Sequence, residues 1–242
     1  MDGIARREDD TLDYPLFVPL GKAGGDIDAH QFIASFLDIS ITNRRTISTT
    51  ALLTAHVFLS ILYHRHPERL RTPREAMVAG AGCIVLASKS ASTLTEGKDV
   101  AWVKTMAEAI MTREKCSRDE EAALRKSIEV YESLALEASG YNPSVYLPHQ
   151  YLETILDRLY GSSQARQLLP LVWARCTEAV RTSAVVTHPP CLLAIAAVKS
   201  CPGLYAPAVS IEALYTATAT QTYKHTASAN VDSLVAILQE RQ

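Results

Sequence analysis

The sequence lacks the features that mark several large classes of protein. Its 242 residues hold five cysteines, an odd number, and no two of them form a Cys-x-x-Cys pair, so neither a disulfide framework nor a zinc ribbon is indicated. Lysine and arginine total 24 against 26 aspartate and glutamate, and the net charge of −2 provides no basic field for nucleic acid. These absences favour an intracellular protein that does not bind nucleic acid directly.

Membrane and secretion signals are also missing. The apolar run 76–88 is shorter than the about 18 residues that a membrane-spanning helix needs. The charged residues at 6–10 interrupt any signal-peptide core, and no Asn-x-Ser/Thr acceptor for glycosylation occurs. We therefore expect no membrane partner.

One stretch, residues 72–89, predicts a helix at the centre of a helical bundle. Thr72 is suited to cap the free backbone N–H groups, Pro73 fits the first helical position and Glu75 completes a capping box. From Ala76 to Ser88 there is no charged side chain, and small residues alternate with larger ones. Such a helix must be covered on all sides, and Lys89 would end it at the rim.

A similar stretch follows about a hundred residues later, at 187–200. It also begins with threonine and proline, has an uncharged interior rich in small residues, and ends in Lys199-Ser200, as the first ends in Lys89-Ser90. This repetition indicates two similar helical bundles in tandem. The proline-containing stretch 142–148 is the best boundary between them.

The remaining apolar patterns have helical spacing, and no segment shows the period-two alternation of a strand, so we predict an all-α fold. Besides the two central helices at 72–89 and 188–200, helices are expected near 26–39, 47–64, 100–112, 118–138, 149–160, 164–183, 209–219 and 229–240. Trp102 and Trp173 are expected in the core.

Four stretches in this order resemble the cyclin family: 50–58 (TALLTAHVF), 86–89 (LASK), 131–141 (YESLALEASGY) and 188–196 (HPPCLLAIA). The sequence looks most like the transcriptional cyclins of types T, K, L and C, and the resemblance covers about residues 28–240. It implies two tandem five-helix cyclin-box repeats, 28–142 and 143–242, after an N-terminal extension, 1–27.

The resemblance also implies a function. A cyclin of this kind is a regulatory subunit that binds a cyclin-dependent kinase and holds its αC helix in the active position. In the family a lysine and a glutamate clamp the backbone of αC, and by position these are Lys89 and Glu132. The hydrophobic kinase-facing positions fall on Leu86, Leu136 and Tyr141.

Several further expectations follow from the resemblance. The chain itself would be no enzyme and would have no catalytic residue, cofactor or metal. Its partner would be the kinase catalytic subunit in a heterodimer, with a further regulatory subunit left open. The protein would be nuclear, with the cytoplasm as a second location.

Some positions depart from the family pattern. Ser90 stands where an aromatic or apolar residue is usual, and Ala91 and Ser92 replace a common acidic pair. A cyclin-fold adaptor that does not activate a kinase is therefore an alternative, as is core packing for Tyr141. A DNA-binding module of the general-transcription-factor type would need a basic groove, and an all-α enzyme would need a catalytic motif. Neither feature is found in the sequence.

Overall fold

The computed structural model describes residues 29–35, 47–91, 98–201, 204 and 227–239. Within these ranges every regular element is a helix, which confirms the all-α prediction. The N-terminal extension 1–27 and the predicted helix 209–219 lie outside the described residues, as does most of the loop that precedes the helix beginning at Lys98.

Most helix bounds agree with the sequence pattern to within a few residues. After a helical stretch at 29–35, the elements are α2 (Thr49–Arg65), η1 (Pro67–Arg69), α3 (Pro73–Ser90), α4 (Lys98–Glu114), η2 (Arg118–Glu120), α5 (Glu121–Ala138), α6 (His149–Tyr160), α7 (Ser162–Val180), α8 (Ala184–Thr187), α9 (Pro190–Ser200) and α11 (Ala227–Gln239).

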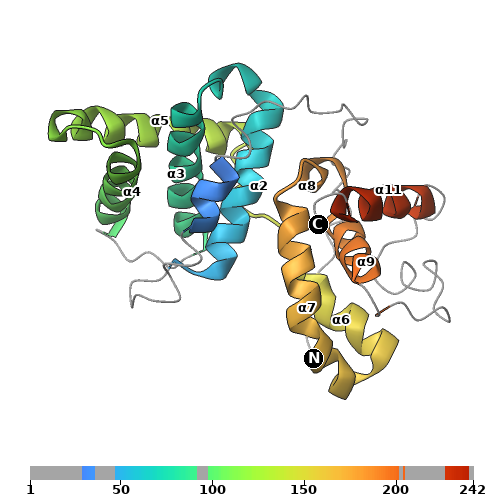
Figure 1. Ribbon diagram of the computed structural model, residues 1–242. Helices are drawn as coiled ribbons and strands as arrows, with labels where there is room; N and C mark the ends of the chain where they lie inside the picture. Colours follow the sequence, from blue (N-terminus) through green and yellow to red (C-terminus); the bar gives the residue numbers. More distant parts are fainter. Residues whose placement is uncertain (1–28, 36–46, 92–97, 202–203, 205–226, 240–242) are drawn as a thin grey trace.

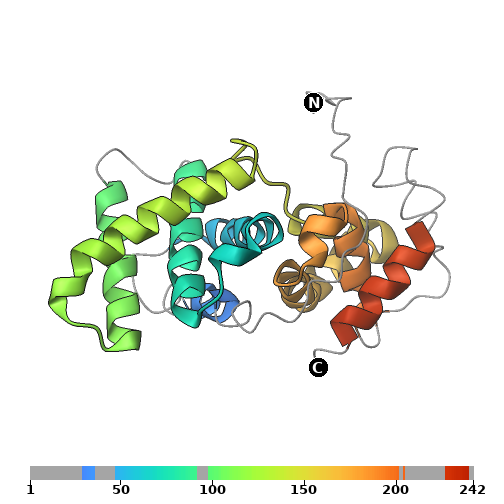
Figure 2. The same cartoon turned by 90° about the horizontal axis from the view of Figure 1, so that it is seen from above.

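These helices form two groups, each with its own core (Figures 1 and 2). The first core is built by helix 29–35 and α2–α5, and the second mainly by α6, α7, α8, α9 and α11. Helix α2 joins them, because its Leu53 and Val57 are buried in the second core while its other buried apolar residues belong to the first. The connector 139–148, between α5 and α6, provides the covalent link.

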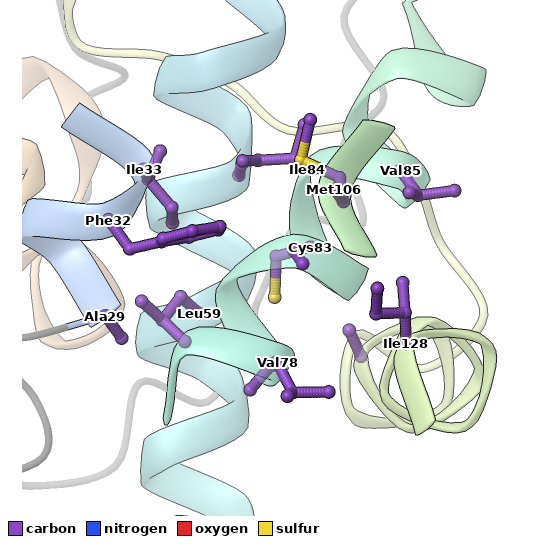
Figure 3. Packing of buried hydrophobic residues seen from close by; sticks show 14 of the residues in the cluster. Ala29, Phe32, Ile33, Leu59, Val78, Cys83, Ile84, Val85, Met106 and Ile128 are labelled. Atoms are coloured by element: carbon purple, nitrogen blue, oxygen red, sulfur yellow. The ribbon is translucent and has the colours of Figure 1, made fainter. Parts of the chain in front are cut away.

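Helix α3 is the centre of the first group. Its start has the predicted capping box: Thr72 Oγ1 accepts from the Glu75 backbone N–H at 3.2 Å, and Glu75 Oε2 accepts from the Thr72 N–H at 3.0 Å. All residues from Ala76 to Ser88 are buried. Figure 3 shows why: Cys83 and its neighbours lie between helix 29–35, α2 and α5.

The second group differs from the sequence prediction at the end of α7. This helix ends at Val180, and a short separate helix, α8, follows it. Thr182 causes the interruption, because its hydroxyl donates to the Ala179 carbonyl at 2.7 Å and accepts from the Ala184 N–H at 3.3 Å. A side chain that competes in this way for backbone hydrogen bonds favours a turn over a continuous helix.

The two tryptophans have different environments. Trp102 is partly buried against the first core, whereas Trp173 on α7 is 37% exposed, so the prediction that it lies in the core is wrong. Trp173 instead packs against the ring of His149, with centroids 4.5 Å apart.

Candidate functional site

Lys89 and Glu132 meet at the surface of the first helical group. Lys89 lies in the last turn of α3, and Glu132 lies on α5, 43 residues later in the chain. The Nζ atom donates to Glu132 Oε1 at 2.7 Å. The lysine side chain is 37% exposed and the glutamate side chain 16%, so the pair is within reach of a partner without being fully solvated.

Gly82 explains how these two helices come close enough for the pair. A Cβ atom on Gly82 would lie 2.7 Å from the Glu132 backbone nitrogen and 2.9 Å from the Tyr131 carbonyl carbon, so α5 packs directly on the α3 backbone here. Lys89 stands seven residues later, about 10 Å along the helix axis. Helical side chains lean toward the N-terminus, which directs the long lysine side chain back toward Glu132.

Leu136 and Tyr141 follow Glu132 at the C-terminal end of α5. Leu136 lies one turn after Glu132 on the same helix face and is partly buried. The Tyr141 N–H donates to the Leu136 carbonyl at 2.9 Å, and Gly140 has a positive φ of 68°, as expected for a helix that ends in a Schellman motif.

Tyr141 has an unusual conformation and a large exposed area. Its φ is 60°, in the left-handed region that costs a non-glycine residue about 1 kcal/mol or more. Its side chain is 71% exposed, which excludes the alternative that Tyr141 fills the core. A strained backbone that presents an aromatic ring to solvent is a frequent feature of binding sites.

Leu86 differs from the expectation that it faces a partner. It is 5% exposed and belongs to the first core, because α3 is covered along its whole interior. Of the five residues named from the sequence, the structure pairs Lys89 with Glu132, and it places Leu136 one turn further along α5 and Tyr141 just after the end of that helix. Leu86 is a packing residue in this conformation.

A second ion pair has the same arrangement in the other helical group. Lys199, in the last turn of α9, donates to Asp232 Oδ1 on α11 at 2.8 Å. Here the lysine side chain is 18% exposed and the aspartate 64%. In the sequence Lys199 is the counterpart of Lys89, but no pattern there indicates Asp232, which the packing of α11 on α9 brings to the lysine.

A pair of buried histidines lies elsewhere in the first group. The Nδ1 atoms of His30 and His56 are 2.7 Å apart, and their rings are stacked. His56 is fully buried, and burial lowers its pKa to about 2, with smaller contributions from His30 and Arg181. The ring is therefore neutral, which suits a structural hydrogen bond better than proton transfer near pH 7.

No metal cluster or membrane span is found in the part of the chain that the structure describes. No three metal-ligating side chains come together there. None of those helices combines the length and apolar character required to cross a bilayer. Comparisons of the sequence with protein-family models and with curated proteins gave no match.

Proposed function

We propose that this chain is a cyclin-type regulatory subunit that binds and activates a cyclin-dependent kinase of the transcriptional type and carries out no catalysis itself.

 In this proposal the two helical groups correspond to two tandem cyclin-box repeats, with α3 and α9 as their central helices. The observation that carries this proposal is the 2.7 Å pair of Lys89 and Glu132, at the positions that the cyclin resemblance assigns to the kinase clamp. The matching pair of Lys199 and Asp232 supports the internal repeat.

The proposed mechanism requires no covalent chemistry from this chain. A protein kinase is active when the lysine on its strand β3 pairs with a glutamate on αC, and it loses activity when αC swings out. A subunit that binds only the inward position of αC shifts the kinase toward the active state. Lys89 would donate to backbone carbonyls of αC, and Glu132 would accept from its N–H groups.

The geometry of the site suits this task. The two charged groups already contact one another, so less conformational entropy is lost when a partner binds them. Charge-assisted hydrogen bonds that are partly desolvated contribute about 1.5–3 kcal/mol each. Leu136 and Tyr141 add apolar area beside the pair, and such area usually supplies much of the affinity.

Binding to purified cyclin-dependent kinase catalytic subunits tests the proposal. With a panel of these kinases, we expect the wild-type chain to bind at least one and to raise its activity, and Lys89→Glu or Glu132→Lys to weaken binding at least tenfold. Lys104→Glu is the matched control, because Lys104 forms an exposed pair with Glu108 on α4, at 3.7 Å. Absence of binding to every kinase in the panel would contradict the proposal.

A charge-swapped double variant separates binding from internal support. Lys89→Glu combined with Glu132→Lys restores an ion pair between α3 and α5 but reverses its polarity. If the pair clamps a kinase helix, the double variant should fold as stably as the wild type and still bind weakly. Recovery of full binding would show that the pair only joins the two helices.

The adaptor alternative is favoured by one observation at the rim. Ser90 replaces the apolar residue usual in the family, and its hydroxyl donates to the Ala87 carbonyl of its own helix at 2.9 Å. This position therefore offers a partner no large apolar side chain. Binding of a kinase without any rise in its activity would identify the chain as an adaptor.

A further inference from the structure

The connector between the two helical groups presents two tyrosines to solvent. Among the described large hydrophobic residues, Tyr141 and Tyr146 are the most exposed, at 71% and 64%. Figure 2 shows the connector running from the end of α5 to the start of α6. Tyr146 belongs to none of the positions that the cyclin resemblance assigns to kinase binding.

The backbone that carries Tyr146 is held in place on both sides. Val145 packs against both cores, and Leu147, 3% exposed, is buried in the second. Adjacent side chains of an extended chain point to opposite sides, so these two inward residues direct Tyr146 outward. The Ser144 N–H also donates to Asn142 Oδ1 at 3.0 Å, which further fixes the connector.

Outward direction alone does not require an aromatic residue at position 146. A small polar side chain would satisfy the same alternation without exposing apolar area to water. Tyrosine on a fixed backbone instead provides a large contact area with only two side-chain torsions to order, which lowers the entropic cost of binding. Tyr146 thus has the properties of a preorganised anchor for another protein.

We infer that the partner surface continues from Glu132 and Tyr141 along the connector to Tyr146, and that the kinase catalytic subunit covers it. This inference rests on the proposed function. The two tyrosines are five positions apart in the chain, so they lie at most about 18 Å apart and fit within one ordinary protein interface. The kinase would present an apolar surface to the Tyr146 ring and a hydrogen-bond partner to its hydroxyl.

The experiment measures the affinity of purified cyclin-dependent kinases for Tyr146→Ala. We expect binding to weaken about tenfold, as for an aromatic residue at an interface. The unfolding midpoint should not change, because the side chain is exposed. Leu171→Ala is the control, since Leu171 on α7 is 48% exposed and lies outside the connector.

The outcomes distinguish this inference from the proposed function. If Lys89→Glu weakens binding and Tyr146→Ala does not, the surface ends before Tyr146 and the inference is wrong, whereas the proposed function stands. If no kinase in the panel binds the wild-type chain, both are wrong. An equal loss in Leu171→Ala would also overturn the inference, because the effect would then not be specific to the connector.

Discussion

Gly82 on α3 lies against the backbone of Glu132 on α5, so closely that a Cβ atom there would be 2.7 Å from the glutamate nitrogen. The atoms in the way are backbone atoms of a packed helix, and they cannot move aside as the end of a flexible side chain can. This contact sets the separation of α3 and α5 where the candidate site begins. The site therefore depends on a residue that is itself buried.

Gly82→Ala should destabilise the protein by about 1–3 kcal/mol, the usual cost of overpacking. It should also weaken the proposed binding to a kinase, because α5 would carry Glu132 away from Lys89. Gly80→Ala is the control: its Cβ would meet its nearest neighbours at 3.5 Å, an ordinary contact. Alanine stabilises the interior of a helix by about 0.5–1 kcal/mol relative to glycine. Gly80→Ala should therefore leave the free energy of unfolding, measured in urea, unchanged or higher.

Thr72→Ala should remove about 1 kcal/mol from the free energy of unfolding. The threonine hydroxyl bonds both the backbone and the side chain of Glu75, and alanine can do neither. Thr72→Ser keeps the hydroxyl and should restore most of the lost stability. Equal stability of the alanine and serine variants in urea would show that the capping box contributes little.

The local sequence was sufficient to predict most helices but not how they pack. The capping box at Thr72 and the uncharged interior of α3 are short-range signals, and both are present in the structure. The break after Val180 was missed because it depends on one hydroxyl, that of Thr182, competing for backbone groups. A pattern of apolar residues does not record such competition.

The candidate site was predictable only where a family pattern was available. That pattern identified Lys89 and Glu132, and the structure brings them together. It also named Leu86, which is buried, because the sequence does not show which face of a wholly apolar helix a partner could reach. The sequence does not single out Tyr146, because its exposure depends on the packing of Val145 against both cores and on the burial of Leu147 in the second.

Cysteine labelling should follow burial. Burial raises the pKa of the Cys83 and Cys176 thiols, so neither provides reactive thiolate in the folded protein. Cys116 is the one cysteine that is not buried. Brief treatment with iodoacetamide should therefore modify Cys116 first, and mass spectrometry should find all five cysteines modified after denaturation. Early modification of Cys83 would contradict the packing around α3.

Acidification should destabilise the protein through its buried histidines. Burial lowers the pKa of His56 to about 2 and that of His149 to about 4, whereas an unfolded histidine has a pKa near 6.5. At a pH between the folded-state and unfolded-state pKa values, the unfolded chain binds more protons than the folded protein. The stability that comes from the neutral, buried histidines is therefore fully present above pH 6.5 and decreases as the pH falls below it. At pH 5, which is above the folded-state pKa of both histidines, each histidine should lower the free energy of unfolding by about 2 kcal/mol.

His56→Gln and His149→Gln test this assignment one site at a time. Each variant loses stability at pH 7.5 through its altered packing, but it no longer has the buried group that must gain a proton on unfolding. The difference in unfolding free energy between pH 7.5 and pH 5, measured in urea, should therefore be about 2 kcal/mol smaller than in the wild type. If the difference is the same in a variant and in the wild type, the histidine replaced in that variant is already solvated in the folded state, and its part of the acid sensitivity comes from other groups.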